Sequence, residues 1–185
     1  MAETEDQVKD LIVGCGRNER ASQEKLYKQF YVPLFCLCRR FFSNDHEAIE
    51  AVNDGMLKVF QRIDSYREER GKFFTWVYTI VRNTAVDKFR SSVRIVAVDP
   101  MSVEEVLTEE SVGANPAVWL EGMDLGILFE ALSPAPRGIC TLFYLEGYKI
   151  TEIAEVLGVS IGTVKWHLSE SRKKLKPVLE KYVNQ

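Results

Sequence analysis

The tract TEIAEVLGVSIGTVKWHL at residues 151–168 constrains the fold more than any other part of the sequence. A helix-turn-helix needs a small residue where its two helices touch and a turn residue that tolerates a positive φ. It also needs apolar residues that hold the second helix on the first. Ala154, Gly158 and Val164 meet these needs at the usual separations. The positions that we expect to fill the core are Ile153, Leu157, Val159 and Leu168.

The second helix of this predicted motif has two different faces. Counting about 100° per residue from Val164 places Leu168 and Leu175 on the inner face. The opposite face is typical of a recognition helix in the major groove, where lysine contacts guanine or phosphate and an aromatic ring contacts thymine methyls. A solvated lysine-rich face is the alternative. The predicted DNA-binding residues are Gly162, Lys165, Trp166, Ser169, Arg172 and Lys173.

Two other residues of this helix qualify that prediction. We expect His167, at the edge of the inner face, to be a half-buried structural histidine rather than a catalytic or metal-binding one. Glu170 opposes phosphate binding and indicates either a cytosine contact or a weak site. Because the formal net charge of the chain is -3, this small basic helix is expected to bind DNA weakly when it acts alone.

Charge divides the chain into three parts. Residues 91–120 hold 1 Lys or Arg against 5 Asp or Glu, whereas the parts on either side are nearly balanced. This stretch also contains Pro100, Gly113 and the Asn115-Pro116 pair, and it has no sustained helical period. We therefore predict an all-α protein with two small helical domains at 1–91 and 118–185. A flexible acidic linker at 92–117 joins them, and the second domain has four helices.

Apolar residues recur at helical spacing in three segments of the first domain. Pro33 predicts a break or kink in the first segment, Asn44 or Asp45 can cap the second, and Gly55 is expected to loosen the second. The side chains that we expect to face inward are Leu26, Phe30, Leu34, Leu37 and Phe41, then Ile49, Val52, Met56, Val59 and Ile63, then Phe73, Val77, Ile80, Val81 and Thr84.

The second of these segments turns an exposed leucine among acids toward the outside. The residues of this face are Glu50, Asn53, Asp54 and Leu57. Acidic side chains repel DNA, so the face indicates a protein partner. A solvated helix face is the alternative.

The third segment carries a second stripe beside its core face. Residues 72–94 hold 5 basic side chains against one acidic one. Basic residues interleaved with aromatic rings and amides suit single-stranded or locally opened DNA. The alternative is that the aromatic residues belong to the core. The stripe consists of Trp76, Thr79, Asn83, Asp87 and Arg90, of which all but Thr79 are predicted DNA-binding residues.

Several classes of function find no support in the sequence. The four cysteines show no CxxC spacing, so we expect buried free thiols and no metal site. No nucleophile triad or phosphate-cradling loop occurs, which predicts no enzymatic activity and no cofactor. The acidic start MAETEDQVKD is unlike a signal peptide and no apolar stretch is long enough to span a bilayer, so we expect a cytoplasmic protein.

Two motifs separated by a linker give the chain a family resemblance. The run F-x-x-W-x-Y-x-I-x-R-N-x-x-x-D occupies residues 73–87, and E-I-A-E-V-L-G-V-x-x-G-T-V-K occupies residues 152–165. From about residue 22 to residue 180 the sequence resembles the extracytoplasmic-function (ECF) group of bacterial sigma factors in the sigma-70 family.

The resemblance implies a role for each face. In that family the amino-terminal domain binds the clamp helices of the largest polymerase subunit and opens the promoter −10 element. The carboxyl-terminal domain binds the polymerase flap and reads the −35 element. Matched residue by residue, the polymerase-binding helix falls on Glu50, Asn53, Asp54 and Leu57, and the loop that captures an unstacked −10 base on residues 65–72. The −10 helix falls on Trp76, Asn83, Asp87 and Arg90, and the −35 reader on Lys165, Trp166, Ser169 and Arg172.

The chain departs from the family pattern at a few of these positions. Asn53 and Asp54 stand where glutamine and glutamate are usual, and Trp166 and Glu170 replace smaller or basic residues. The resemblance implies a sigma factor that recruits core RNA polymerase to promoter DNA and is a monomer when free. An anti-sigma factor is a further partner that it suggests, and direct membrane insertion is not expected.

Two other functions fit part of the sequence. One is a helix-turn-helix regulator that dimerises to bind a palindrome, for which we find no self-complementary apolar face beyond Leu57. The other is a protein-interaction adaptor whose basic tract binds acidic protein rather than DNA.

Overall fold

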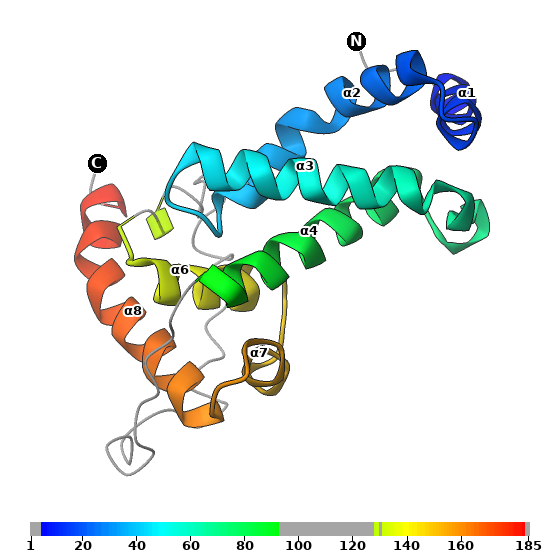
Figure 1. The fold of residues 1–185 in the computed structure, drawn as a ribbon. Helices are drawn as coiled ribbons and strands as arrows, with labels where there is room; N and C mark the ends of the chain where they lie inside the picture. Colours follow the sequence, from blue (N-terminus) through cyan, green and yellow to red (C-terminus); the bar gives the residue numbers. More distant parts are fainter. Residues whose placement is uncertain (1–4, 93–127, 130, 184–185) are drawn as a thin grey trace. The chain divides into compact units, whose positions relative to one another are not determined.

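The computed structural model describes residues 5–92, 128–129 and 131–183, and all regular structure in these ranges is helical (Figure 1). The described residues form two compact units, one with residues 5–39 and 44–88, the other with residues 40–43, 89–92 and the described residues from 128 onward. The predicted acidic linker lies outside the described residues apart from Ser92. One of the four helices predicted for the second domain, around Leu120 to Ala131, also lies mostly outside the described residues.

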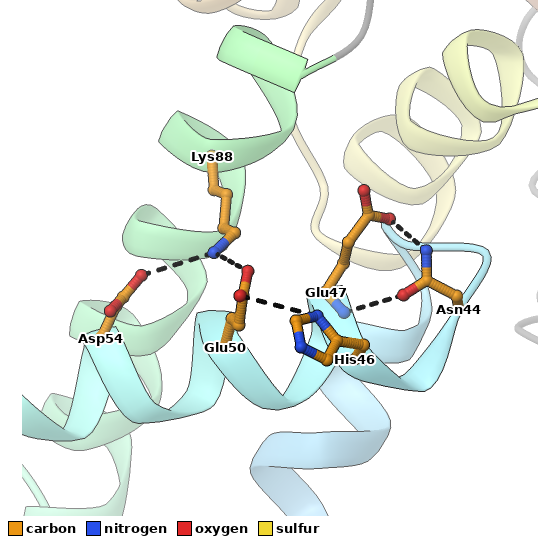
Figure 2. Close-up of polar contacts among 6 residues, drawn as sticks. All are labelled: Asn44, His46, Glu47, Glu50, Asp54 and Lys88. Carbon is orange, nitrogen blue, oxygen red and sulfur yellow. Dashed lines mark hydrogen bonds and ion pairs between the residues drawn. The ribbon is translucent and has the colours of Figure 1, made fainter.

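The first unit is built on four helices: α1 (Glu5–Gly16), α2 (Arg20–Arg39), α3 (Asp45–Gln61) and α4 (Phe73–Ser92). The 3-10 helices η1 (Ile63–Ser65) and η2 (Glu68–Arg70) connect α3 to α4. α2 continues through Pro33, so of the predicted break or kink the break does not occur. Asn44 caps α3 as predicted, because its Oδ1 accepts a hydrogen bond of 2.8 Å from the Glu47 amide (Figure 2).

The core of this unit matches the predicted inward positions except at Ile49 and Ile80. Ile80 is half-buried, and Ile49 is 36% exposed on α3. The buried stripe of α3 is rotated toward small residues, because Ala48, Ala51 and Gly55 lie on it together with the larger apolar side chains. The apolar spacing predicts the helix correctly, but on α3 a large apolar side chain does not always mark the inner face.

Gly55 has a packing role that the sequence did not indicate. A Cβ at this position would lie 2.9 Å from Cγ2 and 3.0 Å from Cα of Val81 on α4. α3 remains helical through Gly55, so the expectation that this glycine loosens the helix is not supported. Gly55 instead allows α3 and α4 to pack with their backbones unusually close.

The second unit holds α6 (Pro134–Cys140), the π-helix η6 (Thr141–Leu145), α7 (Ile150–Leu157) and α8 (Ile161–Val183). Gly158 ends α7 in the left-handed conformation with φ of 68°, as the predicted turn requires. The Ser160 hydroxyl then accepts a hydrogen bond of 3.0 Å from the Thr163 amide at the start of α8. Of the residues predicted to fill the core of the motif, Val159 is half-buried, whereas Ile153, Leu157, Val164, Leu168 and Leu175 are buried.

The cysteines are free thiols, and three of them are buried as expected. Burial raises the pKa of the Cys15 and Cys140 thiols to about 11 and that of Cys38 to about 12. Cys36 is exposed, so the expectation of burial is wrong for this residue.

Candidate interaction surfaces

The four residues predicted to bind a protein partner lie together on one side of α3, and we call them the acidic face. Asn53 and Asp54 are exposed, Glu50 is half-buried, and the Leu57 side chain is 57% exposed. Spacings of three, four and seven residues place them on one helical surface. Ile49 adds a second exposed apolar side chain four residues before Asn53. The structure thus presents two apolar residues among acids.

A lysine from the neighbouring helix joins the two carboxylates of the acidic face. Lys88 Nζ lies 2.7 Å from Glu50 Oε2 and 3.5 Å from Asp54 Oδ2, so one ammonium on α4 bridges two acids on α3 (Figure 2). The hydrogen bond from Lys88 and its positive charge lower the pKa of Glu50, and the same hydrogen bond raises the pKa of Lys88. His46 Nδ1 lies 3.5 Å from the other Glu50 oxygen.

Asn53 is held from the opposite side, by α2. The Tyr27 hydroxyl donates a hydrogen bond of 2.7 Å to Asn53 Oδ1. Tyr27 stands beside Tyr31, with 5.6 Å between the ring centroids, and desolvation raises the pKa of Tyr27. Helices α2 and α4 therefore both fix side chains of the acidic face. The sequence analysis identified neither Tyr27 nor Lys88, because each is far from its partner along the chain.

The predicted −10 residues share the outward side of α4. Asn83, Asp87 and Arg90 are exposed, whereas Trp76 is half-buried. The Trp76 ring lies 5.7 Å from the ring of Tyr66 and 5.7 Å from that of Phe73, measured between centroids. Trp76 is thus partly a core aromatic, in line with the structural alternative, while the polar members of the stripe face outward.

The loop at residues 65–72 is tied by backbone and side-chain hydrogen bonds. The Tyr66 hydroxyl donates to the Gly71 carbonyl at 3.0 Å, and Arg67 Nη1 donates to the Asp64 carbonyl at 2.6 Å. Gly71 has φ of 134°, a conformation that favours glycine.

A pocket of about 390 Å³ opens beside this loop. Four of its lining residues come from the loop, and α1 supplies others that the sequence analysis did not identify. No pattern in the sequence indicates that α1 approaches a loop more than fifty residues later. The lining consists of Val8, Lys9, Ile12, Phe30, Tyr66, Glu68, Gly71, Lys72, Phe73 and Phe74.

The predicted −35 residues lie on the side of α8 away from its buried stripe. Lys173 is exposed, and Gly162, Lys165, Trp166 and Ser169 are partly exposed. Glu170 forms an ion pair of 2.8 Å with Lys173, three residues later on the same helix. The acid that seemed to oppose phosphate binding is therefore partly neutralised by a neighbour on its own helix.

Arg172 makes a contact inside the second unit. Its Nε donates a hydrogen bond of 2.7 Å to the Tyr144 hydroxyl, and the side chain is half-buried. Burial raises the pKa of Tyr144, while Arg172 acts in the opposite direction. Arg172 is therefore partly a structural residue, although a guanidinium has further N–H groups that can donate to phosphate.

His167 is more buried than we expected. The side chain retains only 6% of its exposure, and Nε2 has no hydrogen-bond partner within the described part of the chain. Desolvation lowers its pKa from the ordinary value of 6.5. The structure thus gives this histidine the expected position on the inner side of α8.

Two kinds of feature are absent from the described residues. Across residues 5–92 and the described part beyond 127, no helix combines the length and apolar character needed to cross a membrane. The same residues contain no cluster of three or more His, Cys, Asp or Glu side chains with the arrangement of a metal site.

Two family models match the parts of the chain that carry these surfaces. The family model for Sigma-70 region 2 matches residues 26–95, and the model for Sigma-70 region 4 matches residues 125–175. The first match covers the acidic face and the stripe on α4. The second covers the helix-turn-helix and the outward face of α8 as far as Leu175.

Two similar proteins are ECF RNA polymerase sigma factors. SigE of Mycolicibacterium smegmatis is 28% identical over 166 residues, which cover 87% of this chain and 63% of that protein. SigW of Bacillus subtilis is 25% identical over 157 residues, which cover 79% of this chain and 82% of that protein. The chain therefore spans less than two thirds of the length of SigE and more than four fifths of SigW.

A solved structure of CnrH in complex with the cytosolic domain of CnrY is similar with a TM-score of 0.47 and 20% identity, over 95% of this chain and 98% of that one. A likeness of this degree supports no conclusion about partners. The two family models occur in order along the chain, and the relatives match both parts of it. The chain belongs to the ECF group of the sigma-70 family of RNA polymerase sigma factors, a family of non-enzymatic proteins that act in transcription initiation.

Proposed function

We propose that this chain recruits core RNA polymerase to promoters with −10 and −35 elements and helps to open the −10 DNA. The observation that carries the proposal is the order of the two sigma-70 regions, each with its own candidate surface. Residues 1–91 act as the clamp-binding and −10 domain, residues 92–117 as the acidic linker between the domains, and residues 118–185 as the −35 domain. A linker of this kind lets two domains reach separated DNA elements while both are bound to one large partner.

The acidic face is the proposed contact with the clamp helices of the largest polymerase subunit. Leu57 supplies exposed apolar area, and Glu50 and Asp54 supply negative charge around it. A buried apolar centre with a charged rim is a common arrangement in specific protein interfaces. The family membership supports this partner over the dimerisation and adaptor alternatives.

The outward stripe of α4 and the adjacent loop are the proposed −10 site. Asn83, Asp87 and Arg90 present polar groups to the edges and phosphates of an opened strand. The loop at 65–72 borders a pocket with aromatic side chains, and an unstacked base gains stacking energy from such rings. Trp76, held in the aromatic cluster, contributes the exposed part of its ring.

The outward face of α8 is the proposed −35 reader. Lys165 and Ser169 can contact base edges, and Trp166 can contact thymine methyls or sugars. Gly162 allows close approach to the backbone of the DNA, while Arg172 and Lys173 contact phosphate. The second domain is also the proposed contact with the polymerase flap.

Run-off transcription with purified core polymerase tests the function. Promoters from a genomic library of the source organism serve as templates, and transcripts are mapped with and without the protein. We expect defined start sites that depend on the protein. Absence of such transcripts from every promoter, together with a stable dimer in gel filtration that ignores core polymerase, would contradict the proposal.

Two parts of the proposal concern the protein outside the complex. We propose that the free protein is a cytoplasmic monomer without direct membrane insertion. An anti-sigma factor is a further proposed partner, on the strength of the family alone. Gel filtration of the free chain checks the first point.

A further inference from the structure

We propose that Lys88 is a positioning residue for polymerase binding, which holds the carboxylates of Glu50 and Asp54 in the orientation that a basic segment of the polymerase binds. The inference rests on the proposed function of the acidic face. It adds a residue from α4 to a site whose predicted members all lie on α3.

The geometry of the two helices places Lys88 at this point. Two contacts join α4 to α3. Lys88 forms an ion pair with Asp54, and Thr84 accepts a hydrogen bond of 3.1 Å from Lys58 Nζ. The residue number falls from 88 to 84 on α4 while it rises from 54 to 58 on α3, so the two helices are antiparallel. The close contact between Gly55 and Val81 brings the helices near enough for one lysine to reach both acids.

Lys88 is suited to hold the carboxylates rather than to bind a partner itself. Its side chain is only 26% exposed, whereas those of Glu50 and Asp54 are 46% and 58% exposed. The ammonium is thus less exposed than the two carboxylates that it bridges, and Figure 2 shows it between them. Lys88 bridges Oδ2 of Asp54 and Oε2 of Glu50, and each carboxylate has further lone pairs for a second cation.

Two effects of Lys88 on binding oppose one another. Fixing two side chains in advance lowers the entropic cost of association. The positive charge of Lys88 also offsets part of the negative charge that attracts a basic partner. Salt weakens the repulsion between Lys88 and a basic partner, whereas it does not weaken the entropic gain. We therefore expect the positioning effect to dominate.

The affinity of the full-length chain for core polymerase decides between these effects. Lys88→Met keeps the length of the side chain and removes its charge, and we expect about tenfold weaker binding. Lys88→Arg restores a cation and should recover most of the affinity. Lys28→Met is the matched control, because Lys28 on α2 pairs with Glu24 and touches neither acid.

A double-mutant cycle separates positioning from a general loss of stability. Glu50→Gln should cost less affinity in the Lys88→Met background than in the parent chain, because the carboxylate is no longer held. Additive effects of the two changes would overturn the inference. Thermal unfolding monitors the fold, and Lys88→Gln, which keeps one donor group, replaces Lys88→Met if that variant does not fold.

The outcomes distinguish this inference from the proposed function. If the parent chain does not bind core polymerase, the proposed function fails. If the parent binds and Leu57→Arg does not, while Lys88→Met binds as well as the parent or more tightly, only the inference about Lys88 fails.

Discussion

The acidic face of α3 and the outward face of α8 both contain ion pairs, but the pairs are made in different ways. Glu50 is bridged to Lys88, 38 residues away on another helix. Glu170 is paired with Lys173 within a single turn of α8. The first surface is therefore organised by packing between helices, and its geometry depends on the fold of the unit. The second is organised partly by local sequence, through the pair within one turn of α8, and partly by packing, through the hydrogen bond from Arg172 to Tyr144.

The largest expected effect concerns the apolar centre of the acidic face. Leu57→Arg places a charge where we propose that the polymerase buries an apolar side chain, and core binding should fall by at least about a hundredfold. Affinity for core polymerase is measured by fluorescence anisotropy, and circular dichroism checks the helical content.

Val32→Arg is the control, because Val32 on α2 is 66% exposed and lies outside the proposed interface. It should bind core polymerase like the parent chain. If Leu57→Arg bound core polymerase as tightly as the parent chain, α3 would not belong to the interface.

The next effect concerns the packing that organises the first surface. Gly55→Ala introduces a Cβ that meets Val81, and overpacking of this kind typically costs about 1 to 3 kcal/mol of unfolding free energy. Urea unfolding measures the loss. Lys25→Ala, at an exposed position of α2, should change stability by less than about 0.5 kcal/mol. A stable Gly55→Ala variant would show that α3 and α4 can separate, and that Lys88 is held less firmly than its distances indicate.

A smaller effect is expected from the local pair on α8. Glu170→Gln removes a negative charge close to DNA and releases Lys173, so binding of the polymerase complex to promoter DNA should strengthen severalfold, most clearly at low salt. Lys165→Ala should instead weaken it and alter the preference at the −35 element. Electrophoretic mobility shifts with −35 variants measure both changes. If Lys165→Ala weakened binding equally for all −35 variants, Lys165 would be a phosphate contact rather than a residue that reads bases.

The smallest expected effect is a difference in pH response between the two units. The pKa of His167 is lowered below its ordinary value of 6.5, so the unfolded chain binds a proton more readily than the native one. The contribution of neutral His167 to the free energy of unfolding is complete above pH 6.5 and is lost as the pH falls below 6.5. The pKa of Glu50 is lowered from 4.5, so its contribution persists until the pH falls below 4.5.

Hydrogen exchange measured residue by residue tests this difference. Between pH 7 and pH 5 the amides of α8 should lose protection relative to those of α3, after correction for the intrinsic exchange rate. His167→Gln should remove most of the loss. Equal loss in α3 and α8 would contradict the assignment to His167.

Much of the fold could be predicted because it depends on neighbours in the chain. The apolar period located α2, α3 and α4, the Asn44 cap set the start of α3, and Gly158 set the turn of the helix-turn-helix. Helical hydrogen bonds and caps join residues at most a few positions apart, so a short stretch of sequence contains all the partners. The outward positions of Leu57 and Lys165 followed from the same spacing.

The errors arose where a residue's environment comes from another helix. Ile49 is apolar and in phase with the core, yet it is exposed, and the small residues Ala48, Ala51 and Gly55 are buried instead, with Gly55 packed against Val81 of α4. The packing role of Gly55 was also not foreseen, because a glycine in a helix looks the same in sequence whether or not a neighbouring helix packs against it.

The sequence by itself determined that this protein is all-helical, that it contains a helix-turn-helix and that it belongs with the ECF sigma factors, because these depend on local spacing and on motifs. Only the tertiary structure decided which side chains hold the surfaces in place. Tyr27 reaches Asn53 across 26 positions, Lys88 reaches Glu50 across 38, and Arg172 reaches Tyr144 across 28. Such pairs form only when packing of the apolar faces has brought the helices together, and no periodicity within one helix encodes its partner on the next.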